Sequence, residues 1–571
     1  MDDVQEEVMR TQSPKSYLYS TIAQTHLGEI SSIIITTLIS NGRLTIRELN
    51  VRTKLSIKTI KKALVSLIQL NCIFYWQELN NIFYSFNEIG ILKFLHSGDI
   101  LNHITKKFGE EEAEIIQNVL TFGHIKINDY LSEYDEKTKI KKQELFMKLF
   151  SDKWIVKLNQ FNFNPINDIW NKIFHDILKN TPRSSSQSEI KRVAEAKEKT
   201  REQLKLLLEK SQANIYITQN GIKKLDPNLI VTFNLSRFQK HLRTNAFVNL
   251  AKSRIGILTA EIYKVALETI ENNSPDLTDA EMEINGLLSG PTDVEDHLLN
   301  MEGNLLRDNK IVFNARDISL KLTKKIVLTG SIQTGGRSSQ FEHDEQQPSK
   351  KIKLENGESS NIVIEHSQET VQNHLNLLAS GVTSFITQVS PGRYTVPFYN
   401  LTKKLKLFNF EYLIKATLKE HSFRVFRCVL EQKLTDEKSI SNAVLLKEKQ
   451  VRTEVYHLIK NGFIEIQEIP RSADRAASKT FYSFRSKLKF DYEFLLNCLI
   501  YDLGECLNII QNFKFENKIL LEKCNRIDVK GKENELLMES ELKTLHSLQN
   551  REIKFMVKFN RIKSLYDIFS L

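Results

Sequence analysis

From residue 28 onward, apolar positions first recur at the spacing of α-helices and then run together as in β-strands. Three short helices and two strand-like runs are predicted: 30–38, 46–54 and 56–67, then 73–76 and 82–84. Asn80 and Asn81, between the two runs, tolerate the left-handed backbone that a tight hairpin needs. Three helices followed by a β-hairpin indicate a winged helix.

The same order recurs three times further along the chain. In the second unit, residues 110–158, only one strand of the wing is recognisable, at 154–158. The third unit is split, with helices at 238–270, 315–322 and 368–380 and a hairpin at 384–396. The fourth has helices at 422–431, 437–446 and 447–461 and strands at 463–469 and 479–484. Repetition of one module is therefore the main feature of the sequence.

Two further patterns complete the organisation. Residues 274–302 carry eight acids and no lysine or arginine, and residues 331–361 are rich in Gly, Ser and Gln, so both segments are predicted to be disordered. After residue 491, apolar residues alternate in steps of three and four along two stripes that are separated near Gly531. The two stripes predict an antiparallel helical hairpin.

The predicted fold class is α+β, mostly α: four winged-helix domains with a C-terminal antiparallel coiled-coil hairpin. The predicted boundaries are 1–100 for the first winged helix, 101–165 for the second, 166–230 for a linker with a charged helix, 231–400 for the third winged helix with disordered inserts at about 273–303 and 331–361, 401–490 for the fourth, and 491–571 for the hairpin.

The chain has 80 basic and 70 acidic residues, a net charge of +10 that favours polyanionic partners. Its five cysteines form no CxxC pair, which argues against a disulfide framework or a zinc site. The acidic N-terminus does not resemble a signal peptide, and no apolar run is long enough to span a membrane. We expect a soluble cytosolic or nuclear protein without a membrane partner.

Basic residues concentrate in two of the modules, where they are candidates for DNA phosphate contacts. In the first module the candidates are Arg47, Lys54, Lys58, Lys61 and Lys62. In the fourth they are Lys447, Lys449, Arg452, Arg471, Arg475, Lys479 and Arg485. A solvated or protein-binding helix face explains the first cluster equally well. An ordinary soluble hairpin is the alternative for the second, although its alanine-containing loop favours nucleic acid.

Lys350, Lys351 and Lys353 lie in the Gly, Ser and Gln-rich tract, a setting typical of a nuclear import signal. Enzyme motifs such as GxxxxGK[ST], GxGxxG, HExxH and GxSxG are absent from the sequence, and its histidines occur singly. His241, for example, is more simply a structural histidine than a ligand. We therefore expect no catalytic residue, cofactor or metal.

The segment YLYSTIAQTHLGEISSIIITTLISNGRLTIRELNVRTKLSIKTIKKALVSLIQLNCIFYW and the later segment HLRTNAFVNLAKSRIGILTAEIYKVAL resemble the winged-helix repeat subunit of eukaryotic RNA polymerase III. The likeness covers nearly the whole chain, because four winged helices and a coiled coil follow in the family's order. The acidic and serine-rich inserts do not match the family.

The resemblance implies a nuclear, non-catalytic subunit related to the alpha subunit of general transcription factor IIE. It implies a heterotrimer with two smaller polymerase III subunits, docking near the clamp of the largest subunit, contact with promoter DNA and with initiation factor TFIIIB, and support of promoter opening. The hairpin would then be a docking arm, and its candidate docking residues are Leu496, Leu499, Leu503, Ile510, Phe555 and Phe559.

Two other functions remain open at this point. The first is a scaffold subunit of another nuclear or cytosolic assembly, against which the repeated wings argue. The second is a sequence-specific transcription regulator. It would need base-reading side chains, whereas the third helix of the first module offers mainly lysines, which suit phosphates.

Overall fold

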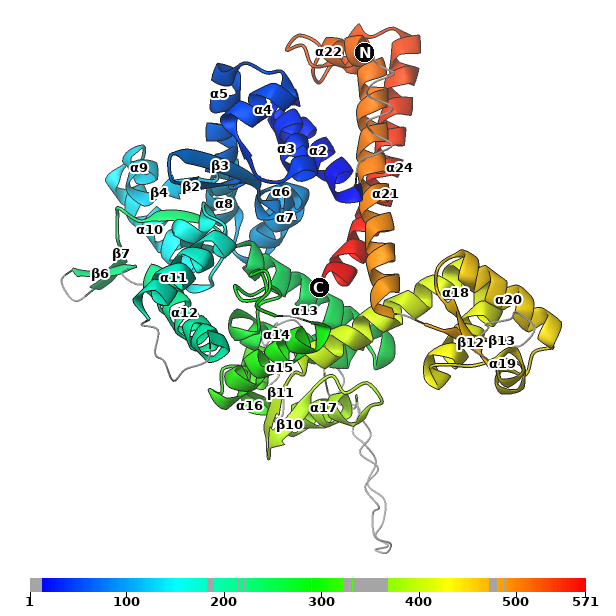
Figure 1. Ribbon diagram of the computed structural model, residues 1–571. Helices are drawn as coiled ribbons and strands as arrows, with labels where there is room; N and C mark the ends of the chain where they lie inside the picture. Colours follow the sequence, from blue (N-terminus) through cyan, green and yellow to red (C-terminus); the bar gives the residue numbers. More distant parts are fainter. Residues whose placement is uncertain are drawn as a thin grey trace, which may run out of the picture. The chain divides into compact units, whose positions relative to one another are not determined.

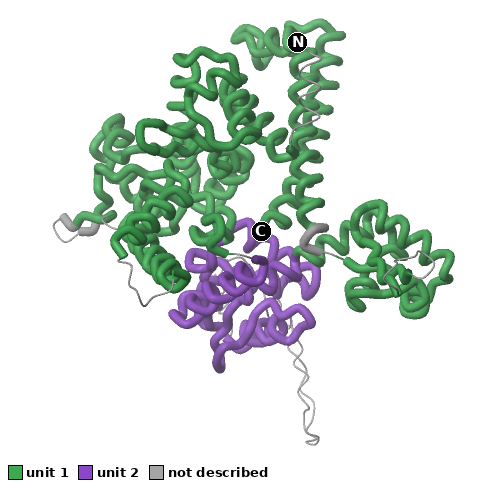
Figure 2. Tube along the Cα trace, in the orientation of Figure 1, with its two compact units in different colours: residues 1–239, 277–289, 406–571 green, residues 240–276, 290–405 purple. Residues whose placement is uncertain are grey.

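The computed structural model describes residues 13–181, 189–212, 215–219, 222–288, 290–322, 328, 331, 368–471, 480–486 and 488–571. They divide into two compact units (Figure 2): residues 1–239, 277–289 and 406–571 form the first, and residues 240–276 and 290–405 form the second. Helices predominate, and each described sheet has two or three strands (Figure 1). The predicted α+β, mostly α fold class is confirmed.

The first winged helix follows the predicted order but begins with one helix that sequence reasoning missed, α2. Its elements are α2 (Pro14–Leu27), α3 (Glu29–Asn41), β1 (Leu44–Thr45), α4 (Ile46–Thr53), α5 (Ile57–Gln69), β2 (Ile73–Glu78) and β3 (Asn81–Phe86), followed by α6 (Glu88–Leu95) and α7 (Ser97–Lys107). Thr45 and Glu48 form a capping box at the start of α4. At the start of α5, the Ser56 hydroxyl accepts a hydrogen bond from the Thr59 amide. The strand order is β1-β3-β2, which leaves β2 at an edge.

The second winged helix is completed by a strand that lies far along the sequence. Its elements are α8 (Glu110–Phe122), β4 (His124–Lys126), α9 (Ile127–Ser132), α10 (Glu136–Ser151), β5 (Ile155–Lys157) and β8 (Ile230–Phe233). β8 pairs with both β4 and β5, so the sheet order is β4-β8-β5. The predicted boundary at residue 165 is therefore too early, because the missing wing strand follows the insertion that had been assigned to a linker.

That insertion folds back on the first winged helix. It contains η1 (Gln160–Asn162), α11 (Ile166–Asn180), α12 (Glu189–Ser211), β6 (Tyr216–Gln219) and β7 (Ile222–Leu225). Ile169 and Trp170 of α11 are buried together with Leu204 of α12, and Trp76 of β2 packs against this cluster. The charged helix predicted at 189–210 is present, but its apolar face is covered.

The third winged helix makes up most of the second unit. Its elements are α13 (Leu235–Arg254), α14 (Ile257–Ile270), η2 (Glu271–Asn273), α15 (Pro291–Arg307), β9 (Phe313–Asn314), α16 (Ala315–Lys321), α17 (Gln368–Ser380), β10 (Thr387–Ser390) and β11 (Arg393–Thr395). The single helix predicted at 238–270 is broken at Gly256, whose φ of 138° no helical residue adopts. The three strands pair in the order β10-β11-β9.

The acidic segment at 273–303, predicted to be disordered, is ordered and contains most of α15. Three of its acids have partners within the second unit. Asp276 pairs with Lys240 at 3.0 Å, Glu295 pairs with Lys403 at 2.6 Å, and Glu302 accepts the backbone amides of Phe398 and Tyr399. Composition failed as a guide here because the compensating cations lie elsewhere in the sequence. The second predicted insert, 331–361, lies outside the described residues except for Ser331.

The fourth winged helix contains the end of α18 (Phe398–Gln432), then α19 (Glu437–Val444), α20 (Glu448–Lys460), β12 (Glu465–Pro470) and β13 (Thr480–Arg485). α18 is kinked at Lys419, whose φ is 72°. Residues after position 406 join the core of this module, where the Phe410 ring contacts the rings of Phe426 and Phe463 edge-on.

The C-terminal segment forms the predicted antiparallel hairpin. It comprises α21 (Leu488–Glu516), α22 (Lys518–Cys524), α23 (Glu533–Leu536) and α24 (Glu539–Ser570), and α21 and α24 run side by side (Figure 1). Ion pairs brace the hairpin away from its base, from Lys514 to Glu552 and from Lys523 to Glu541.

The base of the hairpin is part of two winged-helix cores in the first unit. Leu503 and Phe559 are buried in one cluster with Leu18 of α2 and the core of the first module. Leu499 and Phe569 are buried in the core of the fourth module. The hairpin is therefore a shared structural element and not a free arm.

Charged groups fix the end of α24 against α7. His96 Nε2 lies 3.5 Å from the Asp567 carboxylate, and Lys563 Nζ lies 2.5 Å from the Asp99 carboxylate. Burial raises the pKa of Asp567 to about 6, although the charges of His96 and Lys563 oppose the shift. The nearby His96 side chain, followed by Lys563, lowers the pKa of Asp99 to about 2 despite partial burial.

Close packing of α2 on α21 depends on the absence of a side chain at Gly504. A Cβ at this position would lie 2.7 Å from Cδ1 of Tyr17, whose ring stacks on Tyr501 and whose hydroxyl donates to Glu505. Gly504→Ala should therefore destabilise the first unit by about 1–3 kcal/mol through overpacking. Urea unfolding of the full chain, with hydrogen exchange of α2 and α21 as the local probe, measures this effect.

The matched control is Gly98→Ala in the first turn of α7, where an added Cβ meets nothing within 4 Å. It should be neutral or stabilise the chain by up to about 1 kcal/mol. Equal effects of the two substitutions would contradict the close packing of α2 on α21.

The buried carboxyl of Asp567 should make stability depend on pH. Because its pKa is higher in the folded chain than in the unfolded chain, the stability it contributes is present at low pH and is lost as the pH rises through about 6. Asp567→Asn removes this loss, so the melting temperature of the variant relative to the parent should increase from pH 5 to pH 7. The exposed Asp528→Asn is the control and should follow the parent. A constant difference for Asp567→Asn over this range would refute the assignment.

Candidate nucleic-acid interface

The clearest candidate surface is the exposed face of α5 in the first winged helix. Ile60, Leu64 and Leu67 are buried, and this anchors the helix by one stripe. Lys58, Lys61 and Lys62 occur on the opposite side and are exposed. Within the described part of the chain these three lysines have no ion-pair partner. Three adjacent, uncompensated cations on a helix surface have the charge that phosphate contacts require.

The neighbouring helix carries two more of the predicted residues, both exposed. Arg47 is exposed on α4, and Lys54 is exposed at its end, where φ is 56°. Arg43, which belongs to the same run of basic residues, has a different role. It forms ion pairs at 3.0 Å with both Glu78 and Asp168 and lies over the Phe83 ring. Its charge is therefore used to hold α11 against the wing.

The basic residues of the fourth winged helix are less uniform than the sequence suggested. Lys447 and Lys449 are exposed at the start of α20. Arg452 pairs with Glu437 at 2.7 Å, and Arg485 pairs with Glu465 across the wing, so both charges are largely compensated. Arg475 and Lys479 lie outside the described residues.

The wing of this module carries an aromatic and basic patch, in which Arg471 was predicted from the sequence and the exposed Phe481 ring was not. Phe481 lies opposite Ile469 in the strand pair, and both are exposed, at 50% and 40%. The Arg471 guanidinium lies 3.8 Å above the Phe481 ring. Alternation could not have revealed the exposed ring, because Phe481 and Tyr482 are both exposed whereas the next two residues, Ser483 and Phe484, are both buried.

The predicted docking residues of the hairpin are packed inside the chain, so the prediction that they form a docking surface is wrong. Leu499 belongs to the fourth core, Leu503 and Phe559 to the first, and Ile510 and Phe555 to the contact between α21 and α24. Leu496, partly buried, packs against both cores. The heptad spacing correctly predicts a buried seam but does not identify which helices fill it.

The three predicted nuclear import residues, Lys350, Lys351 and Lys353, lie outside the described residues.

The hairpin carries exposed apolar side chains away from its seam, among them Phe515, Ile519 and Ile553.

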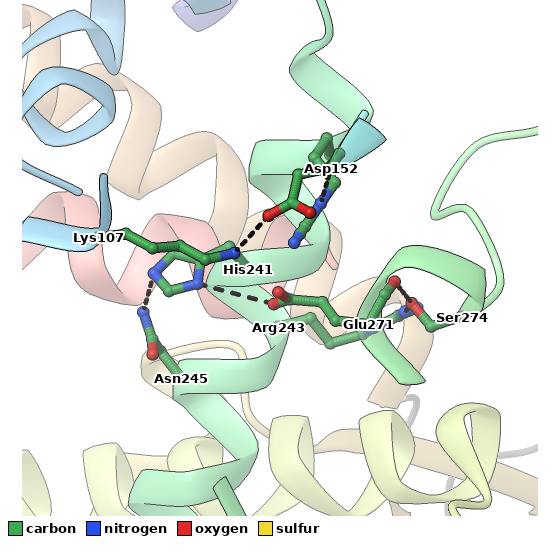
Figure 3. Close-up of polar contacts among 8 residues, drawn as sticks. Lys107, Asp152, His241, Arg243, Asn245, Glu271 and Ser274 are labelled. Atoms are coloured by element: carbon green, nitrogen blue, oxygen red, sulfur yellow. Dashed lines mark hydrogen bonds and ion pairs between the residues drawn. The ribbon is translucent and has the colours of Figure 1, made fainter. Parts of the chain in front are cut away.

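A buried polar cluster in the second unit has the composition of a chemical site but a structural arrangement (Figure 3). Arg243 donates to the Ser274 hydroxyl at 2.7 Å and lies 4.5 Å above the Phe398 ring. Burial lowers the pKa of Arg243 to about 10, although nearby acids oppose the shift, so the guanidinium stays protonated at neutral pH. His241 lies 3.6 Å from Glu271 and 2.8 Å from the Asn245 side chain. His241 is thus held by neighbours, as predicted for a structural histidine.

In the first unit, Lys107 pairs with Asp152 at 3.1 Å (Figure 3). Across the described ranges, no group of three or more His, Cys, Asp or Glu residues is arranged to hold a metal ion. None of the helices that the structure describes is both long enough and apolar enough to cross a membrane.

Comparison with known families matches successive parts of the chain. Residues 17–78 match the RNA polymerase III subunit RPC82 helix-turn-helix domain, and residues 144–405 match RNA polymerase III subunit RPC82. Residues 410–486 match the POLR3C C-terminal winged-helix domain, and residues 519–570 match the helical hairpin domain of DNA-directed RNA polymerase III subunit RPC3.

Full-length relatives agree with these matches. The chain is 53% identical over 595 residues to DNA-directed RNA polymerase III subunit RPC3 of Candida albicans and 50% identical over 610 residues to that of Lodderomyces elongisporus, with 100% of each chain covered. It is 33% identical to the Saccharomyces cerevisiae subunit over 617 residues, which cover 98% of this chain and 94% of the relative.

The expected resemblance is confirmed over the whole length, and the chain belongs to the family of DNA-directed RNA polymerase III subunit RPC3, which the family models also describe as RPC82.

Proposed function

We propose that this chain is a non-catalytic, nuclear subunit of RNA polymerase III that contacts DNA around the transcription bubble and supports promoter opening. Family membership establishes a role in transcription by RNA polymerase III. The finer proposal is that the chain docks near the clamp of the largest subunit, within a heterotrimer with two smaller subunits, and that it meets promoter DNA and initiation factor TFIIIB there.

The observation that carries the DNA-binding proposal is the row of lysines on α5. Lys58, Lys61 and Lys62 project from a helix that is fixed by its buried face, and no described acid neutralises them. Binding to phosphates releases condensed counterions, which makes such a face favourable for DNA and sensitive to salt. The third helix of a winged helix is the element that enters a groove.

The composition of this face argues for phosphate contacts and against base reading. Lysine is a point charge on a flexible stem, whereas base discrimination commonly uses bidentate pairs from Arg, Asn or Gln. Between the lysines and the end of the helix the next exposed side chain is the apolar Val65. This supports DNA binding that does not depend on sequence, as expected of a subunit that acts at many promoters.

The wing of the fourth module supports a second contact, with unpaired bases. Exposed aromatic rings beside a guanidinium stack on bases in single strands, and the Phe481 and Arg471 pair has this composition. Duplex DNA keeps its bases stacked, so this patch is suited to melted DNA. Together the two surfaces support a role at the edge of a transcription bubble.

Reversing the charges on α5 tests the first contact. Lys58→Glu, Lys61→Glu and Lys62→Glu together should weaken duplex binding by the full chain. They should also reduce the slope of log affinity against log salt by about 0.9 for each phosphate that is no longer neutralised. Fluorescence anisotropy over a range of salt concentrations measures both quantities.

The control reverses three exposed lysines on α12, Lys197, Lys199 and Lys205, which changes the net charge by the same amount. It should leave the salt slope close to that of the parent. If both triple variants have the same slope, net charge alone accounts for binding and the α5 face does not.

A pair of aromatic substitutions tests the second contact. Phe481→Ala should weaken single-stranded DNA binding by roughly 5- to 150-fold, which corresponds to about 1–3 kcal/mol for one stacked base, and should affect duplex binding less. Tyr482→Ala is the matched control, because Tyr482 is similarly exposed on the same strand but faces the other way. Equal weakening by the two substitutions, or none by either, would count against stacking on Phe481.

A further inference from the structure

A groove of about 1000 Å³ lies between the wing of the first winged helix and α11 of the insertion. Strand β2 and the residue after it form one wall, and polar residues of α11 form the other. Its lining on the β2 side is Tyr75, Trp76, Gln77, Glu78 and Leu79, and on the other side includes Asp168, Asn171, Lys172, His175, Asp176 and Lys179. None of the candidate DNA-binding residues lines this groove.

The β2 wall is the open edge of a sheet. β2 pairs only with β3, so every second residue of β2 directs its backbone groups away from the sheet. Tyr75 identifies these residues, because its amide donates to the Phe163 carbonyl at 2.9 Å, outside the sheet. Gln77 occupies the next outward position. In the described chain, the backbone N–H and C=O of Gln77 have no backbone partner.

The α11 wall presents two lysines that form no ion pair within the described part of the chain. Lys172 and Lys179 are exposed and lie two turns apart. Two acids of the groove differ, because Glu78 of β2 and Asp168 of α11 share Arg43 as their partner. The groove thus combines an unpaired strand edge with two uncompensated lysines.

We propose that this groove binds an extended segment of a partner polypeptide, which adds as a strand beside β2 and places acidic side chains at Lys172 and Lys179. An added strand satisfies the outward backbone groups of Gln77, which otherwise form an unpaired edge. Trp76 of β2 packs against the buried cluster that contains Ile169 and Trp170 of α11, and this contact joins the two walls. Backbone pairing with β2 supplies the affinity for the segment, and the two lysines select a segment that carries acidic side chains.

Nucleic acid is the less suitable occupant. A phosphate backbone carries negative charge at every nucleotide and would pass close to Asp176, which lies between Lys172 and Lys179 along α11. A peptide can place carboxylates opposite the lysines and neutral residues opposite the acids. The unpaired amide and carbonyl at Gln77 also match the donor and acceptor alternation of a peptide backbone.

The inference rests on the proposed function, because the partner segment is expected in the assembled polymerase. The experiment places a photoreactive amino acid at Leu79, which is 96% exposed at the rim of the groove, in full-length chain assembled into purified RNA polymerase III. Irradiation should cross-link a protein segment rich in acidic residues, identified by mass spectrometry. Gln77→Pro removes the outward amide and should reduce the cross-link at least tenfold, while Gln77→Ala should leave it unchanged.

A second variant does not alter the strand. Lys172→Glu with Lys179→Glu changes exposed helix positions and should also reduce the cross-link at least tenfold, without lowering the melting temperature of the chain. A cross-link to DNA alone, no cross-link, or a cross-link insensitive to both variants would overturn the docking site. A chain that fails to co-purify with the polymerase would contradict the proposed function and the docking site together, whereas co-purification without the cross-link would contradict the docking site alone.

Discussion

Burial of the apolar seam of the C-terminal hairpin is the interaction on which the first unit depends. Leu503 and Phe559 complete the core of the first winged helix, and Leu499 and Phe569 complete that of the fourth. Each fully buried side chain of this kind contributes about 1.5–3 kcal/mol. Modules from opposite ends of the sequence are therefore held by one pair of helices, and neither has a complete core without it.

This use of the hairpin determines which surfaces remain for partners. Its apolar seam is buried within the chain, so the surfaces that remain for partners are those of the winged helices and the outer faces of the hairpin. The first module retains the lysines of α5 and the open edge of β2, and the fourth retains the patch around Phe481. Sites of different chemistry within one unit suit a subunit that contacts DNA and protein at the same time. They also fit a polymerase subunit better than an independent scaffold or a sequence-specific regulator.

The sequence predicted local structure well, because helical spacing, caps and alternation are local properties. The three helices and hairpin of the first module and the hairpin at the C-terminus are present. It could not predict pairing over long separations. Strand β8 joins β4 and β5 only after the insertion that contains α11 and α12. The acids of 274–302 appeared uncompensated because Lys240 and Lys403, which pair with Asp276 and Glu295, lie outside that segment.

The candidate sites were predictable in the same partial way. Composition located the lysines of α5, because their exposure does not depend on residues that lie far away in the sequence. It also included Arg452 and Arg485, whose charges are compensated by Glu437 and Glu465. The heptad pattern identified which residues of the hairpin are buried but not which helices they pack against. An apolar stripe looks the same in the sequence whether it packs within the chain or against another subunit. The groove beside β2 depends on an insertion from another module and had no sequence signal.

Whether the hairpin seam is filled within the chain can be measured directly by hydrogen exchange of α2 and of the seam-facing turns of α21. The exchange rates are compared between the isolated full-length chain and purified RNA polymerase III. If the seam is filled internally, both helices should be strongly protected in the isolated chain, with little change on assembly. Fast exchange in the isolated chain that becomes slow only in the polymerase would contradict this packing, because the seam would then be a docking surface.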